Sequence, residues 1–292
     1  MSNRPGTVQT YILLLPWLAT FSVFWLYPFL YAAVLSLSKV NTLANTMEPV
    51  GFANYAAVFR DSLFWKSLGN TAIFTFGTVP VTAALALLLA VLLNSRIVRL
   101  KSFFRAAYFM PSVTSLVVIS LIFINIYSRD GYVNVLLGLC GLPQSGRGFL
   151  LEPSTALAAV MAMDVWISAG YYMMLFLAGL EAIPKDLYES AHLSGASGWQ
   201  QFSRITLPLL RPTLAFVVVI NTIKSFQVFV EIYVMTKGGP LDSTSTVVYL
   251  IFKSALDNTE SMGYAAALSF VIMAILVFFS LVQLRLLRSS RA

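Results

Sequence analysis

The chain has 292 residues, of which 58% are hydrophobic and only 11% are charged. Soluble domains carry about 25% charged residues and about 45–50% apolar ones, so this composition excludes a soluble protein and indicates a membrane protein. A formal charge of +7 could suggest nucleic-acid binding, but the basic residues do not gather in one patch. The single cysteine, Cys140, excludes an intramolecular disulfide and a Cys-rich metal site.

Six apolar segments are long enough to cross a membrane, since a helix needs about 20 mostly apolar residues to span about 30 Å of hydrocarbon. They are predicted at Tyr11–Leu35, Thr71–Leu93, Ala106–Tyr127, Thr155–Leu180, Pro212–Met235 and Gly263–Leu286. Membrane β-strands would alternate in polarity, and these segments do not. We therefore predict an all-α membrane protein with six transmembrane helices, in which residues 1–292 form a single domain.

Two segments of the N-terminal part of the chain, the first apolar segment and the residues that follow it, need separate interpretation. The first apolar segment follows Arg4, is longer than the apolar region of a signal peptide and lacks an obvious cleavage site, so we predict a retained span. The segment Ser36–Asn70 is rich in aromatic residues and is predicted to be an amphipathic stretch along the membrane surface.

The basic residues predict the orientation of the spans. The N-terminus, the Asn94–Arg105 turn, the Glu181–Arg211 loop and the C-terminus would lie on one side and together carry eleven lysines and arginines. The opposite side carries seven, in longer segments, and Lys224 lies within a span. The positive-inside rule therefore places both termini and the Glu181–Arg211 loop in the cytoplasm.

Motifs of ATP hydrolysis and of catalysis are missing. A phosphate-binding loop of the form G-x-x-x-x-G-K-[ST] does not occur, so any ATP would be hydrolysed by another polypeptide. The only histidine, His192, has no second histidine with which to bind a metal. We expect a protein that is not an enzyme, with no cofactor and no metal site of its own.

The loop between spans four and five, Glu181–Arg211, is unusually long and only moderately polar. Asp186–Leu193 is predicted to be a short helix with acidic residues near its start, where they interact favourably with the helix dipole. Gly195 and Gly198 would end it, and a second short helix over Gly198–Ile205 would stop before Leu207 and Pro208. Two short helices joined by a glycine bend would make a compact projection.

This loop resembles the E-A-A-x-x-x-G…I-x-L-P signature of the membrane subunits of bacterial ABC importers. The positions that match are Glu189, Ala191, Gly195, Ile205, Leu207 and Pro208. Ser190 and Ser194 depart from the signature, which more often has alanine and aspartate there. The segments Gly51–Tyr55, Phe104–Pro111 and Tyr233–Pro240 resemble the carbohydrate-uptake branch, the maltose- and glycerol-3-phosphate-type permeases, so the resemblance covers nearly the whole chain.

The resemblance implies a permease subunit of an ATP-driven importer for a sugar or sugar-like solute. It implies three partners: a second homologous permease, a dimer of ATP-binding ATPase subunits and an extracytoplasmic solute-binding protein. The loop with the matching residues would be the coupling helix that docks on the ATPase. The sequence does not choose between a disaccharide, an oligosaccharide, a polyol and a glycerol phosphate.

Ionisable residues within spans are costly and usually face a cavity or the interior of a bundle. They are candidates for the substrate path, together with two amides on the fifth span: Asp164, Asn221, Lys224, Gln227 and Glu231. At 100° per residue, the four residues on span five fall on one stripe. The stripe would either line a solute path or pack against another helix or subunit, with Lys224 or Asp164 held in a salt bridge.

Two other classes of function stay open on the sequence alone. An ion-coupled secondary transporter or channel would need no ATPase, but often shows paired, interrupted spans in two halves, which are not found here. A membrane enzyme would need a convergent set of acid, base or nucleophile, and the sequence does not bring Asp164, Lys224 and Glu231 together in such a set.

Overall fold

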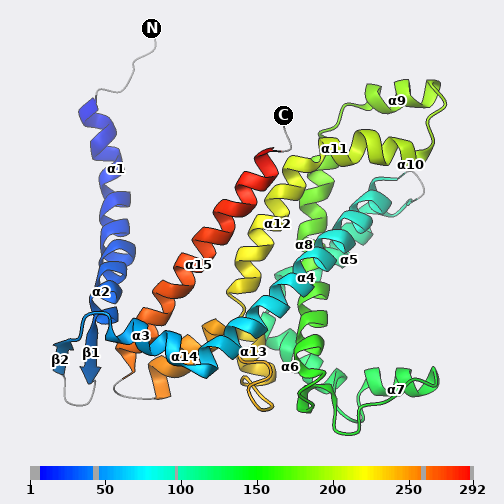
Figure 1. The fold of residues 1–292 in the computed structure, drawn as a ribbon. Coiled ribbons are helices and arrows are strands. Elements are labelled where there is room, and N and C mark those ends of the chain that lie inside the picture. The colour runs from blue at the N-terminus through cyan, green and yellow to red at the C-terminus, as the bar shows by residue number, and fades with distance from the viewer. Residues whose placement is uncertain (1–6, 42–45, 96–97, 258–260, 290–292) are drawn as a thin grey trace. The chain divides into compact units, whose positions relative to one another are not determined.

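The computed structural model describes residues 7–41, 46–95, 98–257 and 261–289, and most of them are helical, as predicted (Figure 1). Three of the basic residues that predict the orientation, Arg4, Arg96 and Arg291, lie outside the described residues. Contacts divide the chain into two compact units. The first comprises Met1–Ser62 and Ile251–Ala274, and the second comprises Leu63–Leu250 and Ile275–Ala292. Each unit is described by itself, and a single domain over residues 1–292 stays a prediction.

In the first unit, the first span consists of α1 (Thr7–Phe21), the π-helical turn η1 (Ser22–Leu26) and α2 (Tyr27–Ser36). Residues Leu13–Ser36 are apolar enough to cross a membrane, and large apolar side chains along them are exposed in this chain. Because water would penalise such exposure, this surface fits contact with lipid or with another membrane subunit. The predicted first span is thus helical where it is described.

The segment after the first span differs from the prediction. In place of one amphipathic stretch over Ser36–Asn70, the chain forms an antiparallel hairpin of β1 (Ser38–Asn41) and β2 (Thr46–Pro49), in which Ser38 pairs with Pro49. The short helix α3 (Ala53–Arg60) follows. The Asn54 amide donates to the carbonyl groups of Ser36 and Ser38, at 2.9 and 3.0 Å, and so ties the hairpin to α3. Apolar periodicity carries no signal for such backbone pairing, so it did not predict the hairpin.

The second unit is organised by α4 (Ser62–Asn94) and α8 (Ala156–Glu181). α8 is the most buried of the candidate spans and packs against α5 (Lys101–Val113) and α12 (Arg211–Phe226). Gly170 makes the contact with α5 possible, because a side chain there would collide with the Tyr108 carbonyl oxygen, 1.8 Å from an ideal Cβ position. Small residues at such crossings let membrane helices approach closely.

The predicted third span, Ala106–Tyr127, is not one straight helix. α5 ends at Val113 and α6 (Leu116–Ile126) begins after a break, and the two helices are bent by 95°. At the break Thr114 is extended, with φ −81° and ψ 151°, so the helical hydrogen-bond ladder stops there. Pro111, which has no N–H group to donate, lies in the last turn of α5.

The described residues contain five helices that are long and apolar enough to span a membrane, or six spans if the bent pair α5–α6 is one of them. The second span is longer than predicted, since α4 begins at Ser62. The predicted fifth span is interrupted: residues Gln227–Phe229 separate α12 from α13 (Val230–Met235). The remaining helices of the described chain are α7 (Tyr132–Leu139), the 3₁₀ turn η2 (Phe149–Leu151), α9 (Lys185–Leu193), α10 (Gly198–Gln201), α11 (Leu207–Leu209), α14 (Val247–Asp257) and α15 (Met262–Ser289).

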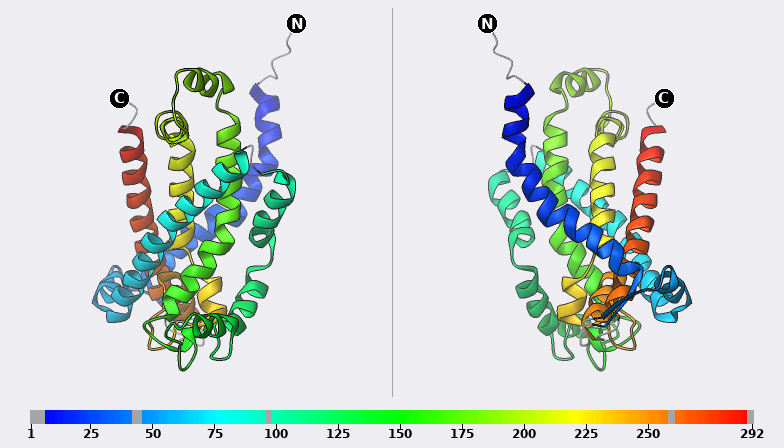
Figure 2. Two further views of the ribbon diagram at one scale, coloured as in Figure 1. Left: turned by 90° about the vertical axis from the view of Figure 1, so that its right-hand side faces the viewer. Right: turned by 90° about the vertical axis from the view of Figure 1, so that its left-hand side faces the viewer.

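The second unit has two distinct ends. In every view α9 and its loop stand at one end of α8 and α12, and α7 and α13 lie toward the other (Figure 1 and Figure 2). The C-terminal end of α4 and the N-terminal end of α5 lie at the same end as α9 (Figure 1). The two loops that the basic residues assign to one side therefore share one end of this unit.

Candidate functional site

The loop between α8 and α12 forms a projection of two short helices, α9 and α10. Gly195 joins them with φ +77°, a left-handed conformation that side-chain-bearing residues rarely adopt. Ser197 then caps α10 in a capping box: its hydroxyl accepts from the Gln200 amide, and the Gln200 side chain accepts from the Ser197 amide. The predicted pair of helices with a glycine bend is therefore present.

The second helix of the projection continues further than predicted. α10 runs through the π-helical turn η3 (Phe202–Thr206) into α11, so the helix does not stop before Leu207 and Pro208 but passes through both. Proline inside an ordinary α-helix collides with the carbonyl group four residues earlier. The wider turn directly before Pro208 relaxes this constraint, which is why the helix continues to Leu209.

Two hydrogen bonds hold the projection together, one between two side chains and one between a side chain and a backbone carbonyl group. The hydroxyl groups of Tyr188 on α9 and Thr206 on η3 lie 2.9 Å apart. The Gln201 amide donates to the Ala196 carbonyl at 3.1 Å. Ile205 and Tyr188 also pack against the apolar cluster around α4, α8 and α12. The base of the projection is thus fixed to the spans.

The outer surface of the projection is apolar at its tip. Leu193 is 89% exposed and Trp199 is 74% exposed, although both are large apolar side chains. A hollow of about 530 Å³ lies beside them, lined by Tyr188, Glu189, His192, Leu193 and Gln201. Of the residues matching the signature, Glu189 and Gly195 are exposed, and the others, Ala191, Ile205, Leu207 and Pro208, are partly buried.

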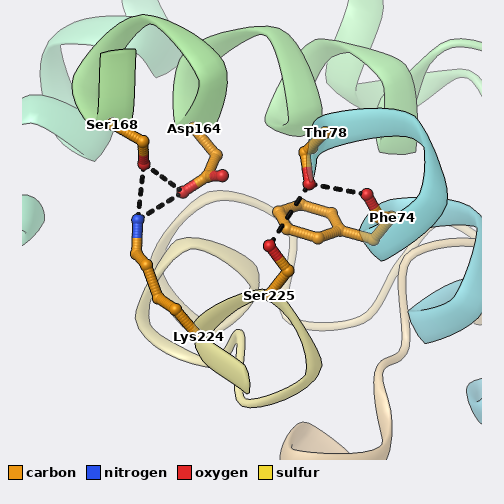
Figure 3. Close-up of polar contacts among 6 residues, drawn as sticks. All are labelled: Phe74, Thr78, Asp164, Ser168, Lys224 and Ser225. Atoms are coloured by element: carbon orange, nitrogen blue, oxygen red, sulfur yellow. Dashed lines mark hydrogen bonds and ion pairs between the residues drawn. The ribbon is translucent and has the colours of Figure 1, made fainter. Parts of the chain in front are cut away.

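A buried ion pair joins α8 and α12 inside the second unit. The Lys224 ammonium donates to Asp164 Oδ1 at 2.9 Å and to the Ser168 hydroxyl at 2.6 Å, and Figure 3 shows the three side chains converging. Asp164 is 2% exposed and Lys224 is 43% exposed. Asp164 therefore sits behind Lys224, which reaches the surface of the chain. Within apolar surroundings each group stabilises the charge of the other.

A pocket of about 260 Å³ opens at this ion pair. Its lining consists of Ser112, Ile167, Ser168, Tyr171, Tyr172, Ile220 and Lys224, from α5, α8 and α12. It combines a charged group and hydroxyl groups with aromatic and aliphatic walls. Such a mixture can orient a polar ligand by a few hydrogen bonds while apolar surfaces contact the rest of it.

The predicted stripe on span five does not face one environment. Lys224 and Gln227 are exposed at the surface of the chain, whereas Asn221 and Glu231 are buried within it. Glu231 lies in the first turn of α13, after the break at Gln227–Phe229, where a negative charge is favourable. Both atoms of the Asn221 amide are buried without a hydrogen-bond partner among the described residues. The interruption displaces Glu231 from the predicted stripe, since a continuous helix was assumed, whereas Asn221 lies on α12 with Lys224 but is buried inside the unit.

Sequence reasoning identified both members of the ion pair but missed most of the pocket. Ser168 follows Asp164 by one helical turn, and this spacing on α8 could have indicated it. Ser112, Tyr171 and Tyr172 carry no such signal, because only the packing of α5 and α12 on α8 brings them to Lys224. The salt bridge that the sequence offered as one alternative is present.

The family comparison agrees with this architecture. Residues 50–291 match the family described as binding-protein-dependent transport system inner membrane component. The chain belongs to this family. The permease is therefore a transport component of an inner membrane and not an enzyme, and the secondary-transporter alternative is not favoured.

Relatives match this permease over nearly its whole length. The lactose transport system permease protein LacF of Rhizobium radiobacter is 34% identical over 96% of this chain and 94% of its own. The arabinooligosaccharides transport system permease protein AraP of Bacillus subtilis is 33% identical over 94% of this chain and 87% of its own. The predicted resemblance to carbohydrate-uptake permeases is thus confirmed.

The fold also has a solved counterpart. A chain of a bacterial ABC transporter involved in the import of the acidic polysaccharide alginate superposes with a TM-score of 0.83. It is 23% identical, and the match covers 96% of this permease and 95% of that chain. At this identity the likeness establishes that the two chains share a fold.

Proposed function

We propose that this permease, together with a second homologous permease, forms the translocation path of an ATP-driven importer for a sugar or sugar-like solute. A solute-binding protein delivers the solute on the outer face, and a separate ATPase dimer binds and hydrolyses ATP. The support for the solute class is that two relatives spanning nearly the whole chain are named for lactose and arabinooligosaccharide transport. The permease itself carries out no covalent chemistry and holds no cofactor.

In this proposal the bent pair α5–α6 counts as one span, which makes six, and both termini are cytoplasmic. The end of the second unit that carries α9 would then face the cytoplasm. Support comes from the basic residues near that end, which include Lys101, Arg105, Lys185, Arg204 and Arg211. Cytoplasmic segments close to span ends are enriched in such residues.

The observation that carries the coupling role is the exposed apolar tip of the projection. Leu193 and Trp199 protrude into what would be the cytoplasm, beside a hollow that includes Glu189. Exposed apolar side chains around a well-fixed base are typical of a docking site for another protein. We place the ATPase there, in contact with Glu189, Ala191 and Gly195, while Ile205, Leu207 and Pro208 transmit its movement to α12.

The pocket at the ion pair is the proposed point of contact with the solute. Lys224 and Ser168 would hydrogen-bond hydroxyl groups, Asp164 would hold Lys224 in place from behind, and Tyr171 would contact the apolar face of a sugar ring. Gln227 directly follows α12 and is also exposed, so we include it in the proposed solute path. Roles for Asn221 and Glu231 in the path stay predictions, because both are buried behind that surface.

The experiment is co-purification of the tagged permease, co-expressed with its partner subunits, in mild detergent. Gly195→Asp places a charged side chain where the backbone is left-handed and where the ATPase would dock. We expect the ATPase to travel with the wild type and to be lost from, or uncoupled in, this variant.

Gly146→Asp is the matched control, because Gly146 is exposed, has open space around it and does not have a left-handed backbone. It should retain the ATPase. Normal ATPase binding and transport in Gly195→Asp would show that the projection is not the docking site.

A further inference from the structure

The short helix α7, in the connection between α6 and α8, has an unusual distribution of polar and apolar residues. Its large apolar side chains point away from the protein: Tyr132, Val135, Leu136 and Leu139, with Leu142 just beyond, form the α7 apolar face. Leu139 is 80% exposed and Tyr132 is 76% exposed. The first four follow the spacing i, i+3, i+4, i+7 of one helical face.

The inward side of α7 packs against the protein through Val133, which lies on an apolar cluster of the second unit, and through one buried polar side chain. The Asn134 amide is buried, donates to the carbonyl groups of Arg129 and Ser145, and accepts from the Ser145 amide, at 2.8 to 2.9 Å. Ser145 is in turn fixed by Glu152 Oε1, at 2.7 Å from its hydroxyl group. A helix on the surface of a soluble protein exposes polar residues, whereas α7 exposes large apolar side chains and buries its one amide side chain.

The position of α7 brings this face to the end of the membrane spans. α6 ends at Ile126, only five residues before α7 begins. α7 runs crosswise to α8 near the end opposite to α9 (Figure 1). Because spans run across the bilayer, a helix that lies crosswise to α8 so close to the end of α6 runs along the membrane plane, where an apolar face can reach the lipid.

The residues around the α7 apolar face are of types that favour the membrane–water interface. Arg129 and Arg147 are exposed on either side of α7 in the chain and can pair with phospholipid phosphate groups. Tyr132 begins the helix, and tyrosine is enriched at membrane–water interfaces because its ring is apolar and its hydroxyl group is polar. Asp130 follows Arg129 and Glu152 lies against the Arg147 backbone, so any attraction comes from the individual guanidinium groups and not from a net positive charge.

We infer that α7 is an interfacial helix, whose apolar face inserts into the lipid bilayer at the end opposite to α9 and anchors the connection between α6 and α8. The inference rests on the membrane location of the family and not on the proposed solute or on ATPase docking. The network around Asn134 holds the helix at a fixed orientation, so the anchor is rigid.

The single native cysteine makes the test simple, since Cys140 can be replaced and one new cysteine introduced. Leu139→Cys/Cys140→Ser places a nitroxide label on the α7 apolar face, and Gly146→Cys/Cys140→Ser places one on the adjacent exposed loop. Both full-length variants are reconstituted in vesicles of phosphatidylethanolamine and phosphatidylglycerol. The accessibility of each label to oxygen, which partitions into lipid, is compared with its accessibility to a water-soluble nickel chelate.

We expect the ratio of oxygen to nickel accessibility to be several-fold higher at 139 than at 146. Adding Leu136→Lys should lower the ratio at 139 and leave that at 146 unchanged, because a charge on the face disfavours insertion. Equal nickel accessibility at both positions would show that α7 faces water. A label at 139 that neither reagent reaches would show that another protein covers the face, and either result overturns the inference.

Discussion

The projection of α9 and α10 and the pocket at Lys224 are built in opposite ways. The hydrogen bonds of the projection join residues at most 18 positions apart in the chain, as between Tyr188 and Thr206, and most of its polar groups are exposed. The ion pair of the pocket joins Asp164 and Lys224, 60 positions apart, and Asp164 is almost completely buried. Local hydrogen bonds shape a surface for another protein, whereas long-range packing creates an interior polar site.

The difference teaches that the two sites should respond differently to mutation. In the projection the cost of losing one hydrogen bond is small for the stability of the chain, so function should fail before folding does. In the pocket, removal of one charge leaves the other in apolar surroundings, so stability and transport should fall together. Separating these two readouts tests the comparison.

The largest effect is expected at the ion pair. Lys224→Met leaves Asp164 buried without its partner, which typically costs about 3–5 kcal/mol of stability; because Lys224 is 43% exposed, we expect about 3 kcal/mol or less. The melting temperature of the detergent-purified permease and its transport in vesicles should both fall. Asp164→Leu should behave similarly, by leaving the ammonium group unpaired.

The double variant Asp164→Leu/Lys224→Met sharpens this prediction. With both charges removed, the melting temperature should return toward that of the wild type, because no uncompensated charge remains. Transport should stay low if the pair contacts the solute. Recovery of transport along with stability would mean that the ion pair is structural and that the solute path lies elsewhere.

A smaller effect is expected in the projection from Tyr188→Phe, which removes the hydroxyl group that lies 2.9 Å from Thr206. The loss should be about 1 kcal/mol or less of stability, since a single hydrogen bond contributes about that much. The coupling of ATP hydrolysis to transport should fall more clearly than the melting temperature.

Phe202→Tyr, on the same projection, serves as the control for a one-oxygen change and should leave coupling intact. If Tyr188→Phe lowered the melting temperature as strongly as Lys224→Met, the contrast between a locally and a remotely built site would be wrong.

The smallest effect is expected at Arg105–Glu181, an ion pair of 2.6 Å between α5 and the end of α8. Both side chains are substantially exposed, so water and salt screen their attraction. Arg105→Gln should change stability by about 1 kcal/mol or less and should leave transport nearly unchanged. A melting-temperature measurement at low and high salt checks this, and an effect as large as that of Lys224→Met would contradict it.

The sequence predicted local features well and distant ones poorly. The helices of the projection and the Gly195 bend follow from neighbouring residues, and four of the six spans follow from apolar length. The bend after Val113 was missed because a run of apolar residues carries no signal for a change of direction, and the hairpin was missed because its two strands have only four residues each and show no clear alternation. The side chains that line the pocket beside Lys224 were missed for a related reason: helix packing, rather than spacing along the chain, brings them together.

The bend between α5 and α6 also indicates how this unit is oriented in the bilayer. With 13 and 11 residues, the two helices are only about 20 and 17 Å long, so neither crosses a hydrocarbon core of about 30 Å alone. Ser115 makes no side-chain cap, so the first amide groups of α6 need another polar partner. Hydrocarbon offers none, and such a break is tolerated at membrane depth only against protein or water. Since Thr114 and Ser115 are exposed on this chain, the elbow faces water or another protein and not lipid, and the pocket that Ser112 lines opens beside it.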